Sequence, residues 1–235
     1  MAARHARSGA VAGPAARGLL QSLVRDDLSN AAFPFLTFRR LDIAMIPALV
    51  GRISFTGELG YEIWVSPDYQ RALYDLLVAA GSEWELKPFG GRALNAMRIE
   101  KGFGTWAREF RPIYGPYEAG LGRFVALEKG DFIGRSAAES ERSSGEGMRL
   151  VAFAVDAADA DAIGDEPIRH GGRVVGWVTS GAYGHRVRQS LALGYVPAAL
   201  AAASEAFEIE IIGERRPARR LAACAYDPGG TRMRS

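Results

Sequence analysis

Hydrophobic residues recur at helical spacing in three segments of the chain. In Ala15–Val24, leucines stand three and four residues apart, which predicts one face of an amphipathic helix. A clearer helix follows Ser66 and Pro67, two residue types that favour a helix start, and Gly81 is expected to end it. A further helix is predicted over roughly Gly91–Lys101, and Gly102 is expected to close it. The first part of the chain therefore contains three predicted helices.

Between the first two predicted helices the pattern changes to alternation, which is typical of β-strands. Arg52–Val65 reads RISFTGELGYEIWV, and apolar side chains alternate on both sides of the turn residues Gly57–Gly60. Glycine accepts the positive φ that a reversing chain requires. The segment therefore predicts a β-hairpin, and it places a carboxylate, Glu62, on the same strand face as Trp64.

The pattern changes again after the polar stretch ERSSGEGM, residues 141–148, which is a candidate linker. The residues after it form short β-rich runs separated by turn residues, the pattern of a small antiparallel barrel. The segment 104–125, rich in glycine, proline and aromatic residues, predicts a long packed loop. We therefore predict an α+β fold with two domains, residues 1–143 and an antiparallel β-barrel over residues 148–235.

Composition and charge agree with an ordinary globular protein: 48% of the 235 residues are hydrophobic and 24% are charged. A net charge of +2, with arginines spread along the chain, gives no argument for nucleic acid as a partner. A single cysteine, Cys224, excludes an internal disulfide. The three histidines lack the spacing of metal ligands, so we expect no metal site. No apolar run has the length of a membrane span, and we expect a cytoplasmic protein.

The first 25 residues leave an alternative localisation open. They contain four arginines and no acidic residue, a composition found in organelle transit peptides. Against this, the turn residues Gly13–Pro14 lead directly into the first predicted helix. That arrangement favours an ordinary folded start.

Candidate chemistry is limited to carboxylates and arginines that lie among aromatic residues. The sequence has no Gly-x-Gly-x-x-Gly after a strand, no P-loop and no Gly-x-Ser-x-Gly elbow, so we expect no FAD or nucleotide site and no serine nucleophile. Arg92, Trp106 and Tyr226 belong to this group and are candidate cofactor contacts. Glu62 is its most informative member, because a carboxylate on a mostly apolar strand must be paired or must serve a ligand.

Two interpretations of Glu62 are open from the residues alone. It can form an ion pair with Arg52 across the hairpin, or lie in solvent at a sheet edge. Its two oxygens can instead accept parallel hydrogen bonds from a fork of N–H donors. Both a guanidinium group and the edge of a pterin ring present such a fork.

Several motifs, in order along the chain, resemble the glycine cleavage T-protein (aminomethyltransferase) family. SFTGELGYEIWV, residues 54–65, resembles the family signature aromatic-x-Gly-Glu-x-Gly-aromatic-Glu, and RALNAMRIEKG, residues 92–102, looks like the helix that follows it. YGPYEAGLGRFVALEKGDFIGR, residues 114–135, is similar to the folate domain of dimethylglycine and sarcosine dehydrogenases. VTSGAYGHRVRQSLALGYV and AYDPGGTRMR resemble the C-terminal barrel of the same proteins.

This resemblance implies a partial T-protein-like folate-binding domain followed by the family's barrel, with tetrahydrofolate as the cofactor. It implies that Glu62 binds the edge of the pterin and that Tyr226 comes from the barrel to close over the folate. Phe55 stands where many relatives have a tyrosine, so a hydroxyl contact is lost there. The arginine that contacts folate in T-proteins corresponds to Leu94, and Arg92 is the arginine two residues before it.

The same resemblance implies a module for one-carbon (aminomethyl or methyl) transfer in the catabolism of glycine betaine, dimethylglycine or sarcosine, acting on a small methylated amine. Relative to the family, the sequence lacks about half a domain at its start, where the aspartate expected to assist the chemistry lies. No catalytic residue is therefore assigned. The alternative is a non-catalytic folate-binding or assembly subunit that needs a flavoprotein dehydrogenase as its partner.

Overall fold

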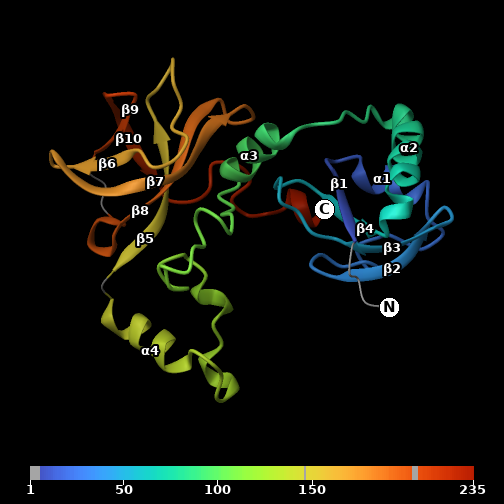
Figure 1. The fold of residues 1–235 in the computed structure, drawn as a ribbon, viewed down its shortest axis with the longest axis horizontal. Helices are drawn as coiled ribbons and strands as arrows, with labels where there is room; N and C mark the ends of the chain where they lie inside the picture. Colours follow the sequence, from blue (N-terminus) through green and yellow to red (C-terminus); the bar gives the residue numbers. More distant parts are fainter. Residues whose placement is uncertain (1–5, 146, 203–205) are drawn as a thin grey trace. The chain divides into compact units, whose positions relative to one another are not determined.

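The computed structural model describes residues 6–145, 147–202 and 206–235. The chain forms two compact units, Met1–Leu94 with Gly229–Ser235, and Asn95–Pro228 (Figure 1). These units are defined by packing, whereas the division after residue 143 is based on sequence motifs and stays a prediction. The helices are α1 (Ala16–Gln21), α2 (Gln70–Gly81), α3 (Gly91–Glu100) and α4 (Arg135–Ser144). The strands are β1 (Arg7–Ala12), β2 (Phe38–Ile43), β3 (Ile46–Gly51), β4 (Gly60–Val65), β5 (Met148–Val155), β6 (Pro167–His170), β7 (Arg173–Gly184), β8 (Gln189–Pro197), β9 (Phe207–Ile211) and β10 (Glu214–Leu221).

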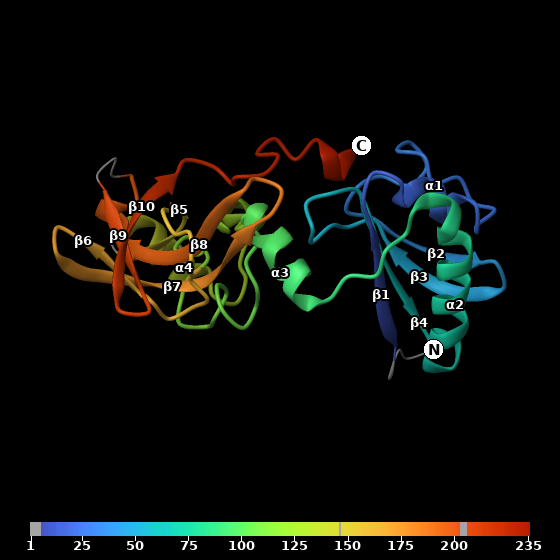
Figure 2. The ribbon, with the colours of Figure 1, turned by 90° about the horizontal axis from the view of Figure 1, so that it is seen from above.

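The first unit is built on an antiparallel sheet with the strand order β1-β4-β3-β2. Helices α1 and α2 lie on the same face of this sheet (Figures 1 and 2). The core between them includes Leu20 of α1, Leu73 of α2 and Ile63 of β4. Tyr61, Ile63 and Val65 are all buried in this core, so Glu62 and Trp64 point to the opposite face, as the alternation predicted.

The predicted hairpin forms with a different first arm. β4 pairs with β3, which ends at Gly51, and residues 52–59 form a loop that contains Phe55. The main-chain N–H of Gly57 donates to Ser54 Oγ at 3.0 Å, and that of Glu58 donates to Thr56 Oγ1 at 3.3 Å. These local bonds compete with a strand ladder, so the segment turns where its alternating pattern predicted a strand.

β1 is an element that the helix and strand patterns did not predict. Most of its residues are small and exposed, so they carry little hydrophobic signal. It pairs antiparallel with β4, and Ala10 is the partner of Glu62 in the register. The chain before the first predicted helix thus forms an edge strand beside the strand that carries the candidate carboxylate.

The second unit contains a closed antiparallel barrel with the strand order β10-β5-β8-β7-β6-β9, as predicted. Alternate residues fill its interior, including Phe153, Val178 and Phe207. β8 is buried on both faces because its other residues, Leu191 and Leu193, pack against Ile99 of α3. A strand buried on both faces is expected to be almost continuously apolar, which explains the run SLALGYV in the sequence.

The segment between α3 and α4 has no strand and only short 3₁₀ turns, as expected for a long packed loop. The linker predicted over residues 141–148 is partly wrong, because α4 extends to Ser144. Glu141 lies in this helix, and its Oε1 accepts the main-chain N–H groups of Tyr117 and Glu118, each at 2.9 Å. A charged residue that looked like part of a solvated linker therefore fixes the loop against the helix.

Candidate functional site

A pocket of about 750 Å³ lies in the first unit, beside the strand that carries Glu62. Its walls come from the end of β1, the start of α1, the loop 53–56, α2 and the segment 84–89. The lining is mainly apolar, and its charged side chains are Glu62, Glu85 and Lys87. A concave, mostly apolar surface with a few polar groups is typical of a small-molecule site.

Glu62, in the middle of β4, is one of the residues that line this pocket. Its neighbours in the sheet are Ala10 of β1 and Gly51 of β3, which are both small and leave the carboxylate uncovered. Glu62 is half-buried, and no group in the described part of the chain forms a hydrogen bond or ion pair with its side chain. Burial raises the pKa of the Glu62 carboxyl above its ordinary value. The lining therefore includes a partly desolvated pair of acceptor oxygens that has no partner in the described part of the chain.

The ion pair with Arg52 that the sequence left open does not form. The guanidinium group of Arg52, which is 1% exposed, donates from Nη1 to the carbonyl oxygen of Phe33 at 2.7 Å. Its Nη2 donates to the main-chain oxygens of Arg234 and Ser235, at 3.1 and 2.9 Å. The guanidinium group of Arg52 is thus hydrogen-bonded to main-chain oxygens of its own unit. The interpretation of Glu62 as the ion-pair partner of Arg52 is wrong.

Phe55 lines the same pocket as Glu62. It lies on the loop 52–59, whose turn at Gly57 has a φ of 84°. Ile53 and Thr56 of this loop also reach the pocket, so the whole turn forms one wall. Of the five predicted cofactor contacts, Phe55 and Glu62 are therefore the two that the structure brings together.

The other three predicted contacts line neither this pocket nor the barrel pocket described below. Arg92 lies exposed in the first turn of α3, and Trp106 is 82% exposed in the following loop. Tyr226 is 9% exposed, and its main-chain N–H donates to the carbonyl oxygen of Glu100 at 2.9 Å. Their roles toward a cofactor stay predictions.

An aromatic wall of the pocket was missed by the sequence reasoning. Tyr74 of α2 and Trp84 and Phe89 of the following segment all line it, and all three are partly exposed. The signal was present in WELKPFGG, residues 84–91, where aromatic residues follow the end of a helix without any strand or helix period. Aromatic residues outside a regular pattern are candidates for a ligand-facing surface.

A buried ionic network in the second unit was missed as well. Glu109, which is 0% exposed, accepts from Arg98 Nη1 at 3.1 Å and from the main-chain N–H of Thr105 at 2.7 Å. The hydroxyl groups of Thr179 and Ser180 donate to its other oxygen at 2.7 and 2.5 Å. The two charged residues of this pair are eleven positions apart, and Glu109 lies in a segment without periodicity, so the sequence pattern gave no sign of the pairing.

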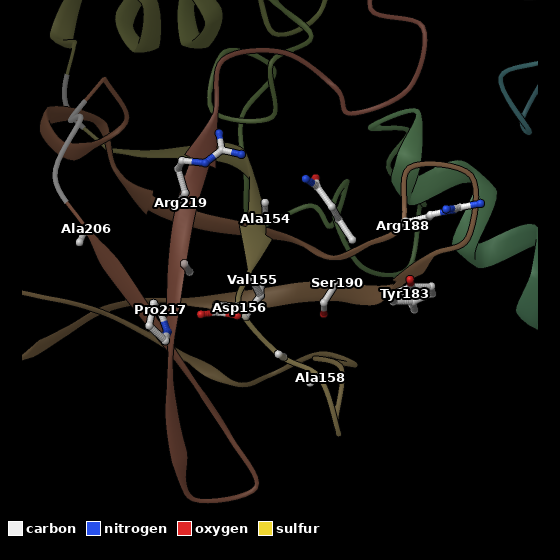
Figure 3. Close-up of a pocket in the computed structure, with 13 residues that line it drawn as sticks. Ala154, Val155, Asp156, Ala158, Tyr183, Arg188, Ser190, Ala206, Pro217 and Arg219 are labelled. Carbon is white, nitrogen blue, oxygen red and sulfur yellow. The ribbon is translucent and has the colours of Figure 1, made fainter.

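A second pocket, of about 770 Å³, lies on the barrel near the end of β5 (Figure 3). Val155 of β5 and Ser190 of β8 are partners in the register and lie together in its lining. The Ser190 hydroxyl is buried and has no hydrogen-bond partner among the described residues. None of the predicted site residues lines this pocket, whereas the exposed residues Arg188 and Arg219 do.

The described residues contain no cluster of three or more histidine, cysteine, aspartate or glutamate side chains that could hold a metal ion. His5, one of the three histidines, lies outside the described residues. In the same part of the chain, no helix is both long and apolar enough to cross a membrane.

Comparison with known proteins matches the chain to two domains of one family. Residues 4–129 match the GCVT N-terminal domain, and residues 149–227 match the glycine cleavage T-protein C-terminal barrel domain. The crystal structure of the glycine cleavage system aminomethyltransferase T from Bartonella henselae has the same fold, with a TM-score of 0.83 and 22% identity. That likeness covers 95% of this chain and 60% of the Bartonella chain.

Two dehydrogenases are similar in sequence. Mouse mitochondrial dimethylglycine dehydrogenase is 43% identical over 209 residues, which are 88% of this chain and 24% of the mouse protein. Human mitochondrial sarcosine dehydrogenase is 37% identical over 187 residues, which are 79% of this chain and 20% of the human protein. The chain therefore spans about a quarter or less of the length of these relatives.

Proposed function

The chain belongs to the glycine cleavage T-protein family, and on that basis we propose that it is a tetrahydrofolate-binding module for one-carbon transfer. The observation that carries the proposal is Glu62, a half-buried carboxylate without a protein partner in a mainly apolar pocket. The proposed context is the breakdown of small methylated amines such as dimethylglycine and sarcosine, which the names of the two dehydrogenase relatives support.

The pocket residues fit the chemistry of the folate head group. A pterin ring presents an amino group and a ring N–H side by side, and a carboxylate can accept both bonds at once. Glu62 would hold this edge, since no described residue competes for its oxygens. Phe55 and Tyr74 would contact the ring systems through their apolar surface. When bound, tetrahydrofolate would supply the nitrogen that accepts the one-carbon unit.

The role of the chain would then be positioning. A cofactor held at its pterin edge is fixed in orientation, and the apolar walls of the pocket exclude water around it. No side chain of this chain is assigned to proton transfer. Tyr226, Arg92 and Trp106 remain proposed contacts to the rest of the folate.

Titration calorimetry with tetrahydrofolate on the wild type and on Glu62→Gln tests the proposal. The amide keeps the size of the side chain but removes its charge and replaces one acceptor by a donor. We expect the affinity to fall by about tenfold or more, because a charge-assisted bond contributes roughly 1.5–3 kcal/mol.

We also expect the affinity of the wild type for tetrahydrofolate to fall toward acidic pH, since protonation of Glu62 removes the same acceptor.

Glu83→Gln is the matched control, because Glu83 is an exposed glutamate of the same unit that does not line the pocket. Equal binding by the wild type and Glu62→Gln would remove Glu62 from the site. Absence of binding by the wild type would contradict the folate proposal itself.

A second candidate function is a non-catalytic folate-binding or assembly subunit that works with a flavoprotein partner. The supporting observation is that the chain spans 24% of dimethylglycine dehydrogenase and 20% of sarcosine dehydrogenase. Under this second function, tetrahydrofolate would bind in the same Glu62 pocket, and the flavoprotein partner would produce the one-carbon unit.

A further inference from the structure

The charged residues that line the Glu62 pocket differ in solvent exposure. Glu62 is half-buried, whereas Glu85 and Lys87 are exposed on the segment that forms its rim. Lys87 is the single cationic side chain among the described residues that line the pocket. No carboxylate in the described part of the chain forms an ion pair with it. The lining therefore combines a half-buried acceptor with an exposed positive charge that has no carboxylate partner in the described part of the chain.

Packing on both sides of Lys87 holds it at this rim. Leu86 packs on the core of the first unit, and its main-chain N–H donates to the carbonyl oxygen of Gly81 at 3.0 Å. Trp84 lies so close to Gly18 of α1 that a Cβ atom at Gly18 would overlap its indole ring. Pro88 restricts the backbone on the other side. The backbone position of Lys87 is thus fixed, although its side chain is exposed.

We propose that Lys87 is a specificity-determining residue that binds the carboxylate of the amino-acid tail of the folate, and this rests on the proposed function. A folate is a pterin joined through an aminobenzoyl group to a glutamate, so it has N–H donors at one end and carboxylates at the other. Glu62 is the half-buried carboxylate of the described lining and suits the first end, and Lys87 is its one cationic side chain and suits the second. The ligand lies with its pterin at Glu62 and its tail at Lys87.

The position of Lys87 also predicts how the charge and the length of the tail affect folate binding. Glu85 and Glu62 give the pocket two negative charges against the one of Lys87. An anionic tail is therefore repelled unless it lies beside Lys87, and each further glutamate of a longer tail reaches into solvent. The ammonium group is exposed, so its contribution depends on ionic strength.

The test compares three ligands on the full chain: tetrahydrofolate, its triglutamate form and a methyl-substituted tetrahydropterin, which has the pterin but no tail. Titration calorimetry or fluorescence quenching gives the affinity of each for the wild type, Lys87→Gln and Lys87→Arg. We expect Lys87→Gln to weaken both tailed ligands about two- to fivefold, the range for an exposed ion pair, and to leave the tetrahydropterin unchanged. Lys87→Arg keeps the charge and is expected to bind like the wild type.

Lys129→Gln is the control, because Lys129 is another exposed lysine, which lies over the ring of Phe132 in the second unit. The expected loss for Lys87→Gln also shrinks when the salt concentration is raised. Equal affinities of the wild type and Lys87→Gln for tetrahydrofolate would overturn the role of Lys87 but leave the folate proposal standing. Equal weakening of all three ligands would overturn it too, since it would indicate a structural effect. Failure of the wild type to bind any of them would overturn both proposals.

Discussion

Glu109 and Glu62 are two carboxylates with opposite surroundings. Glu109 has hydrogen bonds to both of its oxygens from Arg98, Thr105, Thr179 and Ser180. Burial alone would raise its pKa, but these bonds outweigh it and lower the pKa of the Glu109 carboxyl below its ordinary value. Glu62 is partly buried and accepts no hydrogen bond from the described residues, so burial raises the pKa of its carboxyl above the ordinary value. A satisfied buried carboxylate is structural, whereas an unsatisfied one in a pocket is a candidate for ligand binding.

We expect Glu109→Gln to lower the free energy of unfolding by about 3 kcal/mol, because it leaves the buried charge of Arg98 without its counter-charge. Chemical denaturation followed by circular dichroism measures this. Glu128→Gln, a change at an exposed glutamate of the same unit, is expected to stay within about 0.5 kcal/mol of the wild type. A Glu109→Gln protein as stable as the wild type would show that the network contributes little.

The lowered pKa of Glu109 also predicts how stability depends on pH. In the unfolded chain the carboxyl titrates near its ordinary value of about 4.5, and in the folded chain it titrates lower. The stabilisation is therefore complete above about pH 4.5 and is lost as the pH falls through the folded pKa. Denaturation curves from neutral pH downward are expected to fall more steeply for the wild type than for Glu109→Gln. Parallel curves would contradict this assignment.

At the scale of elements, α1 and the segment 84–89 form one side of the Glu62 pocket together. Gly18 is the contact point, since only a residue without a Cβ leaves room there for the indole of Trp84. Trp84 is 39% exposed, so it can move outward if Gly18 is enlarged. The shape of the pocket therefore depends on a glycine that does not itself contact the ligand in our proposal.

We expect Gly18→Ala to displace Trp84 and to weaken tetrahydrofolate binding several-fold, while the free energy of unfolding changes by less than about 1 kcal/mol. The gain in helix propensity, about 1 kcal/mol, offsets part of the cost of moving the ring. Tryptophan fluorescence and titration calorimetry measure the two effects. Gly91→Ala is the matched control, because Gly91 is a helical glycine with open space around its Cα. Unchanged binding by Gly18→Ala would show that Trp84 is not part of the functional wall.

At the scale of the whole molecule, the chain matches the family's N-terminal domain and C-terminal barrel domain but spans about a quarter or less of the two dehydrogenase relatives. Oxidation of a methylated amine requires an electron acceptor, and the sequence has no dinucleotide-binding motif. We therefore expect the isolated chain to bind tetrahydrofolate without oxidising dimethylglycine or sarcosine. Adding a flavoprotein dehydrogenase from the same source is expected to give co-elution on size exclusion and turnover. Oxidation by the isolated chain would contradict the need for a partner.

Much of the architecture could be read from the local pattern of residues. Alternation in β4 predicted which side chains face the core and that Glu62 does not, because side-chain direction in a strand depends only on register. The short β-rich runs predicted the closed barrel, and the periodic leucines predicted α1 and α2. The edge strand β1 was not predictable, since its small residues become a strand only by pairing with β4.

The sequence by itself determined the strand face of Glu62, the helices, the barrel and, through motif order, the family. The tertiary structure decided which groups the charged side chains pair with. Arg52 binds main-chain oxygens instead of Glu62, Glu109 is paired across the chain with Arg98, Thr179 and Ser180, and Lys87 and Trp84 meet Glu62 at one pocket. The physical reason is that secondary structure follows from neighbours along the chain, whereas the pairing of a charge follows from neighbours in space.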